Sequence, residues 1–349
     1  MFKPNKREQN IVTILIRGKS MRSSDIHSVL KDKEDVSLVT VKRILSEMAD
    51  KGLLTVFGSG RSTNYQATSL GRIFYEINTK EYLSTEPDKR YGLDGYNFDL
   101  FSSFPKEIFL KEEIKNMEDF TVEYRKKVKK ASLTIRKKEL ERIIIELSWK
   151  SSKIEGNTYT LLDTEKLILR NKKAEGKTKE ETQMILNHKE AFQSAYENKN
   201  IFKTVTRKNL EETHKLLMKD LGVGFGLRKS PVGISGSLYR PLDNIYQIEE
   251  ALNNLVKTIN HFNTPYAKAM IALLGISYIQ PFEDGNKRTG RIMADALLMA
   301  NSCAPLSYRS VDEKEYKEAT LVFYEINSII PFKKIFIEQY EFALKNYLV

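Results

Sequence analysis

The run from Gln280 to Arg291, QPFEDGNKRTGR, constrains this chain more than any other segment. Its glycines and polar residues predict a short loop that opens a helix. Free N–H groups and the macrodipole make a helix start attractive to anions, and Lys287, Arg288 and Arg291 add cations within about one turn. Asp284 beside them suits a divalent metal that bridges phosphate oxygens. The run therefore predicts a site for a polyphosphate with Mg²⁺; the alternative is a solvated helix start with ordinary charges.

These residues resemble the signature of the Fic family (Fido fold), His-Pro-Phe-x-Asp-Gly-Asn-Gly-Arg-x-x-Arg. The chain departs from it at Gln280, where the family has its catalytic His, and at Lys287, where most members have Gly. The stretch 285–289 looks more like the Doc branch, which transfers phosphate rather than AMP. The resemblance implies Asp284 as the metal ligand. It implies catalytic positions at Gln280, Asn286 and Arg288, and a nucleotide site made of Gly285, Asn286, Lys287, Arg288, Gly290 and Arg291.

Both departures change the expected chemistry. A general base has to accept a proton near the working pH, and its loss lowers the rate by about 10²–10⁴-fold. The neutral amide of Gln280 cannot accept that proton, although it can orient a hydroxyl by hydrogen bonds. Glycine would let the backbone approach a phosphate closely, whereas Lys287 supplies a flexible ammonium group. Nucleotide binding is therefore expected, and transfer is left open.

A second segment, SSKIEGN from Ser151, resembles the family's inhibitory motif, Ser/Thr-x-x-x-Glu-Gly/Asn. It follows a helical pattern of apolar residues, so an inhibitory helix is expected over about residues 138–157 with Gly156 near its end. The resemblance implies that Glu155 pairs with Arg291 and blocks the γ-phosphate position. The alternative is a glutamate at a helix end without a partner.

Residues 233–241 resemble the Fic flap, a short β-hairpin that pairs with an extended segment of the target protein by strand addition. Its glycines suit a turn and its apolar residues suit short strands. An ordinary Gly-Ser loop is the alternative. The residues expected to meet the target are Gly233, Ile234, Gly236 and Tyr239.

Residues 6–75 resemble the winged helix-turn-helix family. Ser23 or Ser24 can cap the second of three expected helices, and Ser37 can cap the third. A Gly-Ser-Gly-Arg tip lies between the two expected strands. The elements follow in the order helix 6–17, helix 25–30, helix 38–51, strand 53–57 and strand 64–67.

In a winged helix the third helix enters the major groove of duplex DNA, and a net charge of +11 suits an anionic partner. The alternative is a winged helix used for protein contacts or for dimerisation, and a homodimer would also raise the affinity for DNA. The basic stretch 123–142 is interpreted as a solvated helix face, with a nucleic-acid surface as the alternative. The expected DNA contacts are Ser37, Thr40, Lys42, Arg43 and Arg61.

Composition predicts a cytoplasmic protein, and the two resemblances imply a mainly α fold, with a Fido-fold helical domain after a small winged helix-turn-helix domain. The single Cys303 excludes an internal disulfide framework, no apolar run approaches the roughly 20 residues of a membrane span, and no secretory signal is visible. The histidines show no metal-ligand spacing, so neither zinc nor haem is expected. The expected domains are a winged helix (1–77), a linker or loop (78–103) and a Fic domain (104–349).

Three functions are compatible with these residues. The first is transfer of AMP or phosphate from ATP to a hydroxyl of a target protein, restrained by Glu155. The second is a non-catalytic nucleotide sensor whose bound state changes DNA binding. The third is an antitoxin-like or scaffold protein that uses the flap only for binding.

Overall fold

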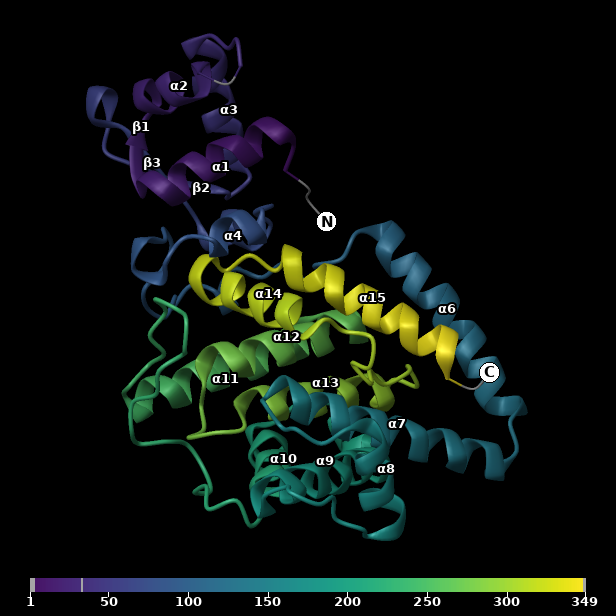
Figure 1. Cartoon of the computed structure of the whole chain (residues 1–349). Helices are drawn as coiled ribbons and strands as arrows, with labels where there is room; N and C mark the ends of the chain where they lie inside the picture. The colour runs from purple at the N-terminus through teal and green to yellow at the C-terminus, as the bar shows by residue number, and fades with distance from the viewer. Residues whose placement is uncertain (1–3, 33, 348–349) are drawn as a thin grey trace. The chain divides into compact units, whose positions relative to one another are not determined.

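Helices make up most of the protein (Figure 1). The computed structural model describes residues 4–32 and 34–347. The chain divides into two compact units. The first contains the described residues up to 104 together with 233–240 and 317–333, and the second contains the rest.

The first unit confirms the winged-helix arrangement, with a three-stranded antiparallel sheet in the order β1-β3-β2. In the third helix, Val41, Ile44, Leu45 and Met48 are buried at spacings of three and four, as the sequence predicts. The elements of this unit before residue 104 are α1 (Lys6–Gly18), β1 (Ser20–Arg22), α2 (Ser23–Lys31), α3 (Leu38–Asp50), β2 (Leu54–Phe57), β3 (Asn64–Ala67), α4 (Ser69–Ile73) and α5 (Thr79–Leu83).

Of the two predicted caps in this unit, one is confirmed and one is wrong. The Ser37 side chain accepts a hydrogen bond from the Thr40 N–H at the start of α3. In α2, however, Ser23 is already helical, and the cap position is Arg22, whose side chain makes no capping bond. The reason is β1, a strand that was not expected, which pairs with β3 as far as Arg22 and brings the chain directly into α2.

The expected flap hairpin is also wrong, because residues 233–240 contain no paired strands. The segment makes one turn, in which the Ser237 N–H donates to the Ile234 carbonyl over 3.3 Å. Its end meets a different part of the first unit, where the Arg240 N–H donates to the Asp94 carbonyl over 2.9 Å. Buried Glu325 accepts a bond from the Ser237 hydroxyl at 2.7 Å. Ser237 thus bonds to α14 (Glu313–Ile326) instead of to a neighbouring strand.

The remaining helices carry the functional candidates on α7 and α13. Helix α7 begins earlier than the inhibitory helix expected at about residue 138 and ends at Ile154. These helices are α6 (Lys111–Lys130), α7 (Leu133–Ile154), α8 (Leu161–Arg170), α9 (Lys179–Glu197), α10 (Arg207–Met218), α11 (Ile245–His261), α12 (Pro265–Ile279), α13 (Asn286–Ala300), α14 (Glu313–Ile326) and α15 (Ile330–Asn346).

Helix α13 lies at the centre of the second unit, beside α12 and against α7, α9 and α10 (Figure 1). Gly290 is required where α13 crosses α12, because a Cβ there would come within 2.9 Å of the Leu273 carbonyl oxygen. Both helices are buried along most of their length. A helix with this much packing holds its first turn in a constant position.

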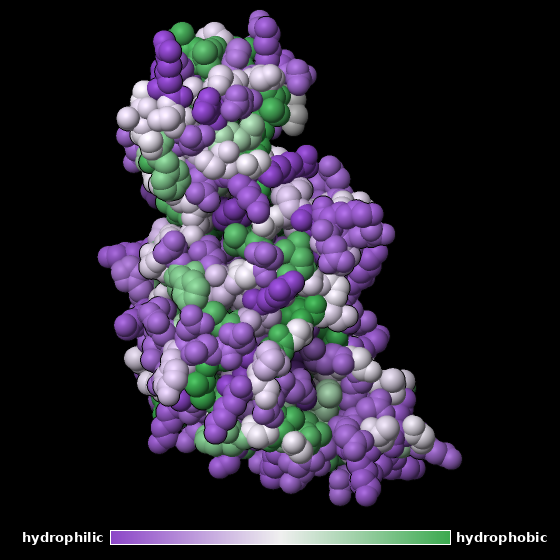
Figure 2. Space-filling model, turned by 90° about the vertical axis from the view of Figure 1, so that its left-hand side faces the viewer, coloured by the Kyte–Doolittle hydropathy of each residue, from purple (hydrophilic) through white to green (hydrophobic). Residues whose placement is uncertain are grey.

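The surface seen in Figure 2 is largely hydrophilic, with hydrophobic side chains in scattered groups. Among the described residues, no helix is both long and apolar enough to span a membrane.

Candidate functional site

The loop before α13 is closed by hydrogen bonds from one side chain, Asn286. Its Oδ1 accepts the Phe282 N–H at 2.9 Å, and its Nδ2 donates to the Phe282 carbonyl at 2.8 Å. Gly285 occupies the cap position with φ 77°, a left-handed conformation that favours glycine. Because glycine has no side chain, no side chain caps the first turn of α13. Its N–H groups are therefore left for an anion.

Gln280 is part of the same hydrogen-bonded loop. It ends α12 with φ 53°, and its Nε2 donates to the Ser277 carbonyl at 2.6 Å. Its Oε1 accepts from Asn286 Nδ2 at 2.9 Å. Both ends of the amide are thus engaged, so in this arrangement Gln280 stabilises the loop.

Arg288 and Asp284 form an ion pair one turn apart, with Nη2 and Oδ2 separated by 2.5 Å. The Arg288 side chain is 3% exposed, whereas that of Asp284 is 64% exposed. Arg288 Nη1 is buried and has no hydrogen-bond partner among the described residues. A buried guanidinium nitrogen without a partner is costly, and a phosphate oxygen would satisfy it.

Asp284 suits Mg²⁺ only as part of a shared coordination shell. The described residues contain no group of three or more His, Cys, Asp or Glu side chains that could hold a metal by themselves. Mg²⁺ commonly uses one or two carboxylates together with substrate phosphates and water. The exposed carboxylate of Asp284 beside an anion site fits that pattern.

Helix α7 reaches this site through Glu155, which pairs with Arg291 at 2.7 Å. Arg291 is fully buried, and its Nε and Nη2 also donate to the Oγ and the carbonyl of Ser151, at 2.8 and 3.1 Å. Lys287 Nζ lies 3.9 Å from the other Glu155 oxygen. Burial acts to raise the pKa of Glu155, but the Arg291 and Lys287 charges outweigh it, so the pKa is lowered and the carboxylate is ionised.

Gly156 follows Glu155 with φ 97° and allows the chain to leave α7. A side chain at this φ would be strained. Gly156 therefore positions the end of α7.

His188 on α9 holds Ser151, and this contact is not apparent from the sequence. Burial lowers the pKa of His188 to about 3, so its ring is neutral and carries one N–H. Nδ1 lies 2.8 Å from the Met184 carbonyl, which can only accept, so Nδ1 carries the proton. Nε2 then accepts a hydrogen bond from the Ser151 hydroxyl over 2.8 Å. A lone pair of the Ser151 hydroxyl is left to accept the bond from Arg291 Nε. The hydrogen bonds therefore run in one direction, from Arg291 to Ser151 and from Ser151 to His188.

A second histidine positions the loop. The His214 ring on α10 stacks on Phe282 with centroids 3.8 Å apart, and its Nε2 lies 3.0 Å from the Asp284 carbonyl. Burial lowers the pKa of His214 to about 4, so it is neutral and donates this bond from Nε2. In the sequence, both histidines show only that they lack metal-ligand spacing. Their proximity to the site arises from helix packing, for which the sequence carries no local signal.

The structure thus brings together most of the predicted nucleotide residues, but not Gly290. That glycine faces α12 rather than the start of α13, so it serves helix packing. The residues that do lie at the site are Gln280, Asp284, Gly285, Asn286, Lys287, Arg288 and Arg291, with Ser151, Glu155 and Gly156 of the α7 end.

The flap residues are only partly available to a partner. Gly233 and Gly236 are exposed and Ile234 is half-buried. Tyr239, in contrast, is 1% exposed and packs on Tyr324 with ring centroids 5.7 Å apart. The expectation that the Tyr239 side chain meets a target is therefore wrong, because the first unit buries it.

The predicted DNA contacts all belong to the first unit. Ser37, Lys42 and Arg43 are exposed at the start of α3, and Arg61 is exposed after β2. Thr40 is half-buried, and its hydroxyl lies 2.9 Å from that of Ser37. Arg43 pairs with Glu47 at 2.8 Å. Exposed pairs of this kind are weak and can be exchanged for a phosphate contact.

Two family matches cover separate parts of the chain. Residues 204–298 match the Fic/DOC family, and residues 5–91 match the penicillinase repressor family. Glu155 lies outside both ranges, so its assignment depends on the geometry above.

The individual proteins that the chain resembles share 18–26% of its residues in the aligned parts, and their names contain the word Fic. The chain is 26% identical over 211 residues to a protein adenylyltransferase Fic of Aedes aegypti, an alignment that covers 56% of this chain and 40% of that relative. Fic-1 from C. elegans matches in structure with a TM-score of 0.56 and 18% identity, covering 68% of this chain and 71% of that one. A Fic domain-containing signaling protein from Bacteroides thetaiotaomicron matches in structure with a TM-score of 0.55 and 18% identity, covering 67% of this chain and 94% of that one. The chain spans about 40% of the length of the curated relatives it matches.

Proposed function

We propose that this chain, whose residues 204–298 form a Fic/DOC domain, binds ATP with Mg²⁺ at the start of α13. The observation that carries the proposal is the start of α13, which no side chain caps. Beside it lies Arg288, whose Nη1 is buried and has no hydrogen-bond partner among the described residues. A triphosphate supplies the acceptors that this arrangement requires.

In this proposal, different residues at the start of α13 bind different phosphates of ATP. Backbone N–H groups of the first turn of α13 and the side chain of Lys287 attract the inner phosphates. Arg288 binds an outer phosphate, and Arg291 binds the terminal one when Glu155 leaves it. Asp284 would hold Mg²⁺, which neutralises phosphate charge when bound.

The reaction we propose is transfer of AMP to a hydroxyl of a target protein. The hydroxyl oxygen bonds to the α-phosphorus, pyrophosphate leaves, and the hydroxyl proton has to be removed. The amide of Gln280 cannot take that proton. The chain therefore supplies positioning and charge stabilisation but no base at this position, and transfer is expected to be slow. Phosphate transfer in a Doc-like register is the variant that Lys287 favours.

Glu155 would restrain the site. Its carboxylate engages the Arg291 Nη2 that a γ-phosphate would otherwise use. A buried Arg–carboxylate pair is a strong competitor for a phosphate oxygen. In this proposal ATP binds weakly, or in a shifted register, until the end of α7 moves.

A second candidate is a nucleotide-sensing regulator of transcription. It is favoured by the use of both amide ends of Gln280 within the loop, a structural role that needs no catalysis. It is also favoured by the exposed cations of the winged helix. In this candidate, ATP binding changes DNA affinity and no group is transferred.

One experiment addresses the shared premise. Calorimetry with ATP and Mg²⁺ should show binding to the full chain, with tighter binding to Glu155→Gly. The same proteins incubated with α- or γ-labelled ATP and a cell extract would separate transfer from sensing. If neither protein binds ATP, both candidates are wrong.

A further inference from the structure

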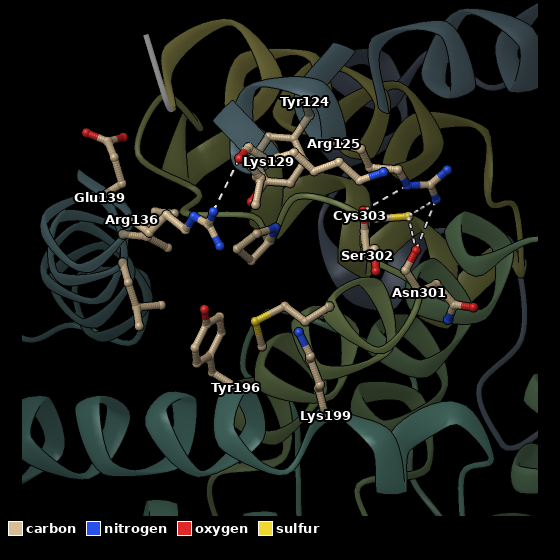
Figure 3. Close-up of a pocket in the computed structure, with 15 residues that line it drawn as sticks. Tyr124, Arg125, Lys129, Arg136, Glu139, Tyr196, Lys199, Asn301, Ser302 and Cys303 are labelled. Atoms are coloured by element: carbon tan, nitrogen blue, oxygen red, sulfur yellow. Dashed lines mark hydrogen bonds between the residues drawn. The ribbon is translucent and has the colours of Figure 1, made fainter. Parts of the chain in front are cut away.

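A cavity of about 480 Å³ lies in the second unit, away from the start of α13. It is bounded by α6, the first half of α7, the end of α9, and the end of α13 with the chain that follows it (Figure 3). Pockets for small molecules typically measure roughly 300–1,000 Å³. The volume is therefore sufficient for a ligand with one ring system or a short chain.

The inner surface of the cavity is apolar. Side chains from the four helices α6, α7, α9 and α13 contribute to it, and two tyrosine rings add flat surface. These residues are Val128, Leu140, Ile143, Met299 and Pro305, with Tyr124 and Tyr196. A ligand would bury hydrocarbon or aromatic surface here, and the removal of apolar surface from water favours binding.

Cations without acidic partners surround this apolar surface. Within the described parts of the chain, no carboxylate pairs with Lys129, Arg136 or Lys199, although all three line the cavity. Among the residues that the structure describes, Arg136 donates only to the Ala131 and Lys129 carbonyls, at 2.9 and 3.3 Å. Lys199 lies over the Tyr196 ring, 5.6 Å from its centroid.

The acidic residue at the cavity does not offset these charges. Glu139 is paired with Arg142 at 3.0 Å and points away from the hollow in Figure 3. In the same view, the ends of Arg136, Tyr196 and Lys199 turn toward the hollow. Arg125 instead turns to the Asn301 and Ser302 carbonyls, which it holds at 3.0 and 3.1 Å. The cavity thus combines an apolar interior with an excess of positive charge.

We propose that this cavity is a second ligand site, which takes a small organic anion. Its phosphate or carboxylate group meets Arg136, Lys129 and Lys199, and its apolar body lies on Val128, Leu140 and Met299. An anion without an apolar body would leave the apolar surface in contact with water. A neutral apolar molecule would gain no attraction from the exposed cations Lys129, Arg136 and Lys199. The combination therefore selects an amphipathic anion.

This site is separate from the proposed nucleotide site. Met299 is near the end of α13 and Asn286 is at its start, which places them about 20 Å apart by helical rise. Arg136 and Glu155 likewise lie near opposite ends of α7. A ligand in the cavity would contact the first half of α7, the helix whose other end holds Arg291.

The test uses 8-anilinonaphthalene-1-sulfonate, an amphipathic anion whose fluorescence rises in apolar surroundings. The folded full chain should bind it saturably, and Arg136→Ala and Lys199→Ala should each weaken binding roughly tenfold or more, since hydrogen bonds to charged groups are lost. Lys199→Arg should retain binding. Lys137→Ala is the matched control, because Lys137 is exposed on α7 and does not line the cavity.

Molecules that displace the bound probe then identify the anionic group and the apolar body that the cavity prefers. Displacement by octanoate would indicate an aliphatic carboxylate, and displacement by AMP that persists in Arg288→Ala would indicate a nucleoside phosphate. Neutral 1-anilinonaphthalene should bind more weakly than the sulfonate. Equal binding by Arg136→Ala, Lys199→Ala and Lys137→Ala would overturn the proposal. Complete displacement by ATP in the unaltered chain but not in Arg288→Ala would also overturn it, because the probe would then occupy the α13 site.

Discussion

Glu155 Oε1 lies 2.7 Å from Arg291 Nη2, across 136 residues of sequence. The contact joins the end of α7 to the second turn of α13. Arg291 is fully buried and receives further acceptors from Ser151. In the ATP-binding mode that we propose, Glu155 occupies the side of Arg291 that a terminal phosphate would contact.

Removal of Glu155 should tighten ATP binding. Glu155→Gly frees Arg291 Nη2, and a phosphate oxygen can then take the place of the carboxylate. Charged hydrogen bonds contribute about 1.5–3 kcal/mol, so a gain of roughly tenfold or more is expected in calorimetry. Glu197→Gly is the control, since Glu197 is exposed at the end of α9. Equal affinity in Glu155→Gly and the unaltered chain would show that the pair does not restrain the site.

Arg288→Ala should weaken ATP binding by about 1.5–3 kcal/mol, the range for a hydrogen bond to a charged group. The reason is its buried Nη1, which has no partner among the described residues. Isothermal titration of Arg288→Ala in the Glu155→Gly background would measure it, with Arg170→Ala, exposed at the end of α8, as the control. An unchanged dissociation constant would place the triphosphate elsewhere.

Rapid transfer should require two substitutions. Glu155→Gly frees Arg291, and Gln280→His supplies a base that can titrate near the working pH. Position 280 has φ 53°, a conformation in which histidine is enriched among non-glycine residues. The double variant should label protein well above either single variant, with α-label indicating AMP and γ-label indicating phosphate.

Two results would contradict that account. Rapid transfer by the unaltered chain would mean that another group accepts the proton. No transfer by the double variant, despite ATP binding, would mean that Lys287 holds the phosphates in an unproductive register.

Stability should depend on pH through His188. Its pKa falls from the ordinary 6.5 to about 3 because the ring is buried. The folded protein therefore resists protonation more than the unfolded chain does, and the free energy of unfolding should fall as pH is lowered from about 6.5 toward 3. His188→Gln keeps a neutral donor and acceptor, so its urea unfolding should show a flatter pH profile. Parallel profiles for both proteins would contradict this.

DNA binding should depend on the winged helix and on salt. The full chain should bind duplex DNA with an affinity that falls steeply as salt rises, because phosphate contacts release counterions. Lys42→Ala and Arg61→Ala should each weaken binding and reduce the salt slope by about one. Lys80→Ala, exposed on α5, should not. Binding that is absent or independent of salt would favour a protein-contact role for this unit.

Local sequence determined the elements and the chemistry they carry. The cap at Ser37, the buried stripe of α3 and the helix start after Gly285 each depend on residues a few positions apart, so pattern and propensity suffice to predict them. The cations and carboxylate of residues 284–291 likewise indicate a phosphate site without any tertiary information. The pairing of Glu155 with Arg291 came from family resemblance, not from the residue pattern.

Tertiary structure decided which side chains meet and which are buried. The link from His188 to Ser151 joins α9 to α7, and no periodicity within either helix specifies it. Tyr239 resembles a target-binding residue in sequence, yet packing on Tyr324 buries it. Strand β1 and the cavity beside α7 also arise from segments distant in sequence. Local propensities act over a few residues, whereas these contacts depend on how whole helices pack, and close packing selects one arrangement.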